Sequence, residues 1–145
     1  KLNMTVNQVK GTAAPSADKV GIVYDVNPTG PQVANGTTIN VTYYGDLPVA
    51  PAPSTAPSIN DTTATPGQAL IATWAGYTSC PSGHTLESYT VLVDGSAVST
   101  VPNATAPFTA PSAEGNHTVS YQVTCSGLAP SASSPTTTFN VSSLN

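Results

Sequence analysis

The chain has 145 residues and a formal net charge of −4, and only 7% of its residues are charged. Its fixed positive charges are three lysines, all near the N-terminus, and it contains no arginine. A nucleic-acid-binding protein needs several Lys or Arg residues to displace phosphate counterions, and binding to an anionic membrane surface has the same requirement. The composition therefore excludes a nucleic-acid partner and direct membrane contact.

The first 45 residues contain three runs in which apolar and polar side chains alternate, a period typical of half-buried strands. Turn-forming residues separate the second run from the third, including Pro28, Gly30 and the dipeptide Asn35-Gly36. Residues 1–45 are therefore predicted to form a small three-stranded module. The three runs are Leu2–Val6, Val20–Val26 and Ile39–Tyr43.

Residues 46–57 are rich in Pro and Ala and contain four prolines. Each proline lacks a backbone donor, and together they favour an extended polyproline II geometry. This stretch is predicted to be a semi-rigid linker, which either holds two units apart or lays a first strand beside the second unit.

Residues 58–145 contain strand-like runs at intervals of about ten residues, separated by Pro or Gly, and this spacing is typical of a β-sandwich. Asp94-Gly95-Ser96 predicts a hairpin between two of the runs. No amphipathic helix of useful length is predicted, so the expected fold class is all-β. The best runs are Ala69–Trp74, Ser88–Val93, Ala97–Val101, Thr118–Cys125 and Thr136–Val141.

The stretch Gly21–Pro28, followed by Gly30, Gly36 and the strand Thr37–Thr42, resembles the second half of a PASTA repeat. In that family a strand leads through a Gly turn to a second Gly and a closing strand rich in Val and Thr. This sequence departs from the pattern in two ways, because its Pro-to-Gly turn is one residue shorter and the helix that opens the repeat is missing. The resemblance covers residues 1–45 and implies a partial PASTA-like module.

PASTA repeats belong mainly to the extracellular parts of bacterial serine/threonine kinases and some penicillin-binding proteins, where they are linked to recognition of peptidoglycan fragments. The resemblance therefore implies the extracellular sensor region of a single-pass, membrane-anchored serine/threonine kinase from an actinobacterium. A cell-wall fragment is the implied ligand, and the cell surface is the implied location. The kinase domain would lie outside this sequence, so no enzymatic activity is expected of these residues.

The segment 58–145 looks like a fibronectin type III domain, or a near relative with an immunoglobulin-like sandwich. Ala72–Trp74 matches the buried strand-B tryptophan of that family, and Leu86–Gly95 matches its strand C and the following turn. His117–Val123 matches strand F, with Tyr121 at the tyrosine-corner position. The resemblance implies a sandwich of two antiparallel sheets.

The same resemblance places the only two cysteines at one pole of the sandwich, with Cys80 after strand B and Cys125 at the end of strand F. We expect a disulfide between them, which fits an oxidising, extracellular compartment. The alternative is a pair of buried free thiols.

No catalytic residue, metal site or cofactor is predicted. Cys80, His84 and Cys125 have the side chains of a zinc site but not its spacing. Neither His84 nor His117 lies in a pattern that pairs it with a nucleophile. The two glutamates lie in polar, turn-like stretches, with no apolar pocket to raise a pKa as glycoside hydrolysis requires.

Three tyrosines are candidates for ligand binding, because an exposed Tyr beside a polar groove can stack on a sugar ring or anchor a peptide. They are Tyr43, Tyr44 and Tyr77. The alternative for each is partial burial at a sheet edge. The other prominent aromatic residues are expected in the core of the sandwich, and they are Trp74, Tyr89 and Tyr121.

Three functions stay open. In the first, the chain is a receptor-kinase sensor that binds a peptidoglycan fragment or another extracellular ligand. In the second, the sandwich is an adhesion module that engages a host or other extracellular protein through its loops or an exposed strand edge. In the third, it is a rigid stalk without a ligand. Three strands without their helix lack a covering surface, so contact between the two units, or homodimerisation through residues 1–45, stays open as well.

Overall fold

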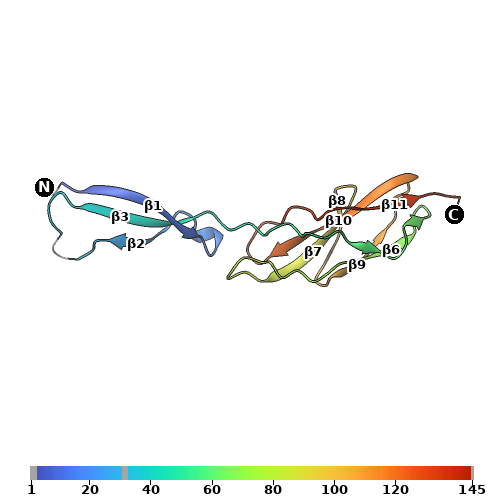
Figure 1. Ribbon diagram of the computed structural model, residues 1–145, viewed down its shortest axis with the longest axis horizontal. Coiled ribbons are helices and arrows are strands. Elements are labelled where there is room, and N and C mark those ends of the chain that lie inside the picture. The colour runs from blue at the N-terminus through green and yellow to red at the C-terminus, as the bar shows by residue number, and fades with distance from the viewer. Residues whose placement is uncertain (1–2, 31–32, 145) are drawn as a thin grey trace. The chain divides into compact units, whose positions relative to one another are not determined.

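The computed structural model describes residues 3–30 and 33–144, and the chain divides into two compact units (Figure 1). Unit 1 is Lys1–Pro48 and unit 2 is Val49–Asn145. The described residues form strands and one short 3₁₀ helix, with no α-helix. The expected all-β fold class is confirmed.

Unit 1 is a three-stranded sheet made of β1 (Thr5–Ala13), β2 (Val23–Asn27) and β3 (Thr38–Gly45), with a 3₁₀ turn η1 (Ala17–Lys19) between β1 and β2. The strand order is β1-β3-β2, so β3 is central. It pairs in parallel with β1 and antiparallel with β2. The first strand begins later than the expected run, because Thr5 is the first residue of β1 to pair with β3; Leu2 lies outside the described residues.

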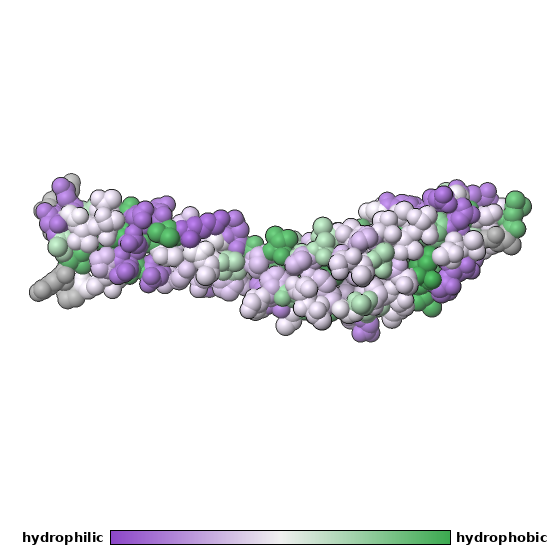
Figure 2. All heavy atoms as spheres, viewed as in Figure 1, coloured by the Kyte–Doolittle hydropathy of each residue, from purple (hydrophilic) through white to green (hydrophobic). Residues whose placement is uncertain are grey.

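The register of unit 1 places six apolar side chains on one face. Val6 pairs with Ile39, and the next rows across the sheet contain Val41 beside Val26 and Tyr43 beside Val23. No second layer covers this face within the described residues, and Val6 is 61% exposed. Figure 2 shows hydrophobic residues reaching the surface of this unit. We call this set the apolar sheet face, defined as Val6, Val23, Val26, Ile39, Val41 and Tyr43.

On the other face of unit 1, one glycine permits a close contact. The rings of Tyr24 and Tyr44 stack with centroids 4.3 Å apart, and the Tyr24 hydroxyl accepts a hydrogen bond of 3.3 Å from the backbone N–H of Thr12. A Cβ atom added to Gly11 would lie 2.1 Å from the Tyr24 hydroxyl. Any side chain at this position would therefore force Tyr24 and Thr42 to move.

Unit 2 consists of two sheets. The larger has the order β5-β11-β10-β7-β8, and the smaller has the order β4-β6-β9. The strands are β4 (Ser58–Ile59), β5 (Thr63–Ala64), β6 (Ala69–Thr73), β7 (Leu86–Val93), β8 (Ser96–Val101), β9 (Thr105–Thr109), β10 (Gly115–Cys125) and β11 (Thr137–Val141).

The five expected runs correspond to β6, β7, β8, β10 and β11, and the expected hairpin joins β7 to β8. Its turn residues Asp94 and Gly95 both have positive φ, of 51° and 82°, as a type I′ turn requires. Three strands were not predicted. β4 and β5 have two residues each, too few for a visible alternation, and β9 contains Pro107, which argues against a strand.

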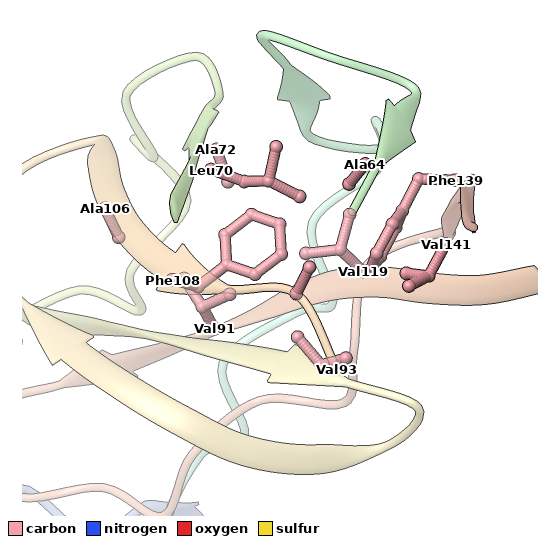
Figure 3. Close-up of a cluster of buried hydrophobic side chains, with 11 residues drawn as sticks. Ala64, Leu70, Ala72, Val91, Val93, Ala106, Phe108, Val119, Phe139 and Val141 are labelled. Atoms are coloured by element: carbon pink, nitrogen blue, oxygen red, sulfur yellow. The ribbon is translucent and has the colours of Figure 1, made fainter. Parts of the chain in front are cut away.

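The core of unit 2 lies between the two sheets, where inward-facing side chains from both layers meet (Figure 3). The rings of Phe108 on β9 and Phe139 on β11 cross at 67°, with centroids 5.8 Å apart. Leu70, Val91 and Val119 are fully buried in the same cluster. Alternation on β6, β7, β9, β10 and β11 therefore produces one continuous apolar layer.

The Pro-rich stretch belongs to unit 2 from Val49 onward. Ala50, Pro53 and Pro57 are buried. Two of its carbonyl groups accept side-chain hydrogen bonds, that of Pro57 from the Thr137 hydroxyl and that of Pro51 from a tyrosine of the β6–β7 loop. The segment Val49–Pro57 thus packs along the sandwich.

Candidate ligand-binding cleft

A cleft of about 310 Å³ opens at one pole of unit 2. One wall is the stretch Ala52–Thr55, and the other is Ala75–Ser79 from the β6–β7 loop. Tyr121 of β10 lies at its base. We call this feature the cleft.

The β6–β7 loop is held by a disulfide and by Tyr77. Cys80 is bonded to Cys125, as expected, which ties the loop to the end of β10. The backbone N–H of Tyr77 donates to the Tyr89 hydroxyl at 2.8 Å, and the Tyr77 hydroxyl donates to the carbonyl of Pro51 at 2.7 Å. Tyr77 therefore bonds the loop to both the core and the Pro-rich stretch, and burial raises the pKa of its phenol.

The base of the cleft is a stack of aromatic rings. Tyr121 is 2% exposed, and its ring lies parallel to that of Trp74, with centroids 4.7 Å apart and an interplanar angle of 16°. Burial raises the pKa of Tyr121, while a hydrogen bond with the Thr55 side chain acts in the opposite direction. The indole N–H of Trp74 is buried and has no hydrogen-bond partner among the described residues. The stacking on Trp74 and the hydrogen bond with Thr55 hold Tyr121 in place at the base of the cleft.

The cleft is uncharged and rich in hydroxyl groups. None of its lining residues carries a charge, and the only titratable side chains are tyrosines. Within the part of the chain that the structure describes, Ser54, Thr78 and Ser79 form no hydrogen bond. Their hydroxyls are both donors and acceptors, so they suit a neutral, polar ligand. The cleft offers no acid, base or nucleophile with a lowered pKa.

Of the three candidate tyrosines, Tyr77 lines the cleft. Tyr43 and Tyr44 belong to unit 1, where they are neighbours on β3 and point to opposite faces of the sheet. Tyr44 stacks on Tyr24, and Tyr43 lies on the apolar sheet face. The sequence did not indicate Ser54 as a cleft residue, because the stretch around it reads as a linker.

The residues considered for a metal site do not assemble into one. Cys80 and Cys125 form the disulfide, and the Nδ1 atom of His84 lies 2.7 Å from the carbonyl oxygen of Ser126. Among residues 3–30 and 33–144, no group of three or more His, Cys, Asp and Glu side chains has the geometry to hold a metal ion.

His117 is paired with a carboxylate but not with a nucleophile. Its Nδ1 atom lies 2.6 Å from Asp94 Oδ2, and its Nε2 atom lies 2.8 Å from the carbonyl oxygen of Ala113. A catalytic triad needs a hydroxyl at the second nitrogen, and a backbone carbonyl takes that place here. The pKa of Glu114 is lowered by hydrogen bonds from Ser143, so it also lacks the raised pKa of a general acid.

The disulfide indicates an oxidising environment, as found outside the cell. In the described part of the chain, no helix has the length and apolar character needed to cross a membrane.

No protein-family model matches this sequence, and no curated protein matches it. Among solved structures, the chain is similar to the fibronectin(III)-like modules of CbhA from Clostridium thermocellum, with 20% sequence identity and a TM-score of 0.40. The match covers 59% of this chain and 90% of that chain. Unit 2 is a sandwich because its strands pair into two sheets with a shared core between them.

Proposed function

We propose that this chain is the extracellular ligand-recognition region of a membrane-anchored PASTA-type serine/threonine kinase. The observation that supports recognition is the cleft, an uncharged and hydroxyl-lined hollow braced by Tyr77 and by the disulfide. The kinase context is supported by the PASTA-like pattern of residues 1–45.

The ligand is a neutral part of a cell-wall fragment, such as an uncharged sugar ring. Free hydroxyls in the walls can exchange hydrogen bonds with sugar hydroxyls, and the half-buried ring of Tyr77 provides apolar contact area. Anionic portions are disfavoured, because residues 49–145 carry four carboxylates and neither Lys nor Arg. The carboxylates are Asp61, Glu87, Asp94 and Glu114.

An NMR titration of the ¹⁵N-labelled chain tests this proposal. A neutral disaccharide of N-acetylglucosamine should shift the amide signals of Ala52, Ser54, Thr55 and residues 75–79, whereas an anionic muropeptide should shift them less at the same concentration. The double variant Thr78→Ala/Ser79→Ala should weaken the response about tenfold, which corresponds to the loss of one or two hydrogen bonds. Ser112→Ala, at an exposed serine of the β9–β10 loop, is the matched control.

Absence of shifts in the cleft at millimolar disaccharide would contradict the proposal. A stalk function makes a different prediction, since replacing residues 49–145 by another sandwich would leave signalling intact. Recognition through the cleft requires that the same replacement abolish the response to the ligand.

A further inference from the structure

Strand β8 is an open edge of the larger sheet. It is the last strand in the order β5-β11-β10-β7-β8 and pairs with β7 alone within the described residues. In an antiparallel pair, about half of the backbone N–H and C=O groups of an edge strand point away from its neighbour. The outer backbone groups of Ser96–Val101 are therefore available to a further strand.

Most of the features that protect edge strands are missing from β8. Natural sheets block their edges with charged side chains, prolines or bulges. The neighbouring edge strand β9 has such a block in Pro107, which lacks a backbone donor. β8 has six residues without a charge or a proline, and its single irregularity is a bulge at Val98.

The bulge lies beside an apolar groove. Val98 has no partner on β7, is 51% exposed and lines a hollow of about 390 Å³ between β8 and β9. Pro107 and Phe108 lie on the opposite side, and Ala69 of β6 completes the apolar lining. An added strand at β8 would thus have a pocket for an apolar side chain beside its backbone ladder.

The charge distribution defines the partner further. No residue of β8 or of the groove is charged, so the paired segment of a partner must itself be uncharged. Unit 2 as a whole carries four carboxylates without Lys or Arg, so positive charges outside the paired segment are attracted.

We infer that β8 and the adjacent groove bind an extended peptide segment of a partner protein by strand addition. The segment is uncharged, alternates apolar with small polar residues, and is flanked by basic residues. It pairs with the outer edge of β8 and places one apolar side chain against Val98 and Phe108. This interaction is separate from the cleft and does not depend on the ligand proposed for it.

Binding of the synthetic peptide KKVTVTVKK to the full ¹⁵N-labelled chain tests the inference. Saturable shifts and slowed amide exchange on alternate residues of β8 are expected. Val98→Lys should weaken binding about tenfold or more, because the groove loses its apolar contact. Ser112→Lys adds the same charge at an exposed serine of the β9–β10 loop, outside β8 and the groove lining, and it should bind like the wild type.

Two further controls decide the mode of binding. The peptide KKVTPTVKK should not bind, since its central proline interrupts the ladder. Equal binding of both peptides, or no shift in β8 at millimolar peptide, would overturn the inference. Shifts in β8 that grow with protein concentration alone and vanish in Val98→Lys would also overturn it, because the occupant would be a second copy of this chain. The disaccharide titration should be unchanged in Val98→Lys.

Discussion

Similar apolar patterns lead to buried side chains in unit 2 and to exposed side chains in unit 1. In unit 2 the alternating residues of two sheets face each other, and Leu70 and Val91 are completely buried. In unit 1 a single sheet carries equally regular alternation, yet Val6 and Val23 remain 61% and 46% exposed. The buried residues that the structure describes in unit 1 are Ala14 and Gly45. Alternation therefore predicts a strand, but only a second layer makes its apolar face into a core.

The sharpest test of this difference compares truncations in the two units. Phe139→Ala should destabilise unit 2 by about 3–5 kcal/mol, because it removes a buried ring from a packed cluster. Val6→Ala should change the stability of unit 1 by less than about 0.5 kcal/mol, as at other exposed positions. Urea titrations followed by NMR report each unit separately through its own amide signals.

Phe139→Leu, which preserves most of the buried volume, is the matched control for Phe139→Ala and should cost less. A large loss of stability in Val6→Ala would contradict the expected difference between the two units. It would show that the apolar sheet face is covered in solution, and sedimentation velocity would then reveal whether a second copy covers it.

Loss of the disulfide should lower the stability of unit 2 alone, since unit 1 contains no cysteine. Cys80 and Cys125 are 45 residues apart in sequence, so their bond restricts a long loop of the unfolded chain. Replacing both cysteines by alanine should destabilise unit 2 by about 2–4 kcal/mol and leave unit 1 unchanged. Reductant should lower the urea midpoint of the wild-type unit 2 and have no effect on the double variant. A wild-type midpoint insensitive to complete reduction would contradict this expectation.

The smallest expected effect is a pH dependence of the stability of unit 2, which arises from the pair of His117 and Asp94. The hydrogen bond to Asp94, followed by that to the Ala113 carbonyl, raises the pKa of His117 above 6.5. The stabilisation of unit 2 by protonated His117 is thus complete below pH 6.5 and is lost as the pH rises through the folded-state pKa of His117. The bond to His117 lowers the pKa of Asp94 below 3.8, so that contribution is present above pH 3.8 and lost as the pH falls through the folded-state value.

Unit 2 should therefore be most stable between these two limits and lose about 1 kcal/mol or less on going to about pH 9. His117→Gln, which cannot take up a proton, should remove this dependence. Urea titrations across the pH range provide the measurement. An unchanged dependence in His117→Gln would assign the effect to another group.

The strands of unit 2 could largely be predicted from sequence, because period-two alternation and the Asp94-Gly95 turn are local signals. The short strands β4 and β5 could not, since each is defined by its pairing with a distant strand. The strand β9 was hidden by Pro107, which an edge strand tolerates where the interior of a sheet does not.

The candidate site was only partly predictable. Tyr77 was a candidate because of its residue type, and the pairing of Cys80 with Cys125 followed from the sandwich resemblance. The wall Ala52–Thr55 could not be foreseen, because polyproline II composition indicates extension but not the surface against which the segment lies. The free edge of β8 likewise depends on strand order, which alternation does not specify.

The pairing of β5 with β11 has a mechanical consequence. β5 lies near the start of unit 2 and β11 near its end, and the two strands run in parallel. Hydrogen bonds of 2.9 Å join Asn140 to Thr62 and Ser142 to Ala64 across this pair. When the ends of unit 2 are pulled apart, the force acts along both strands in opposite directions and loads these bonds together rather than one by one.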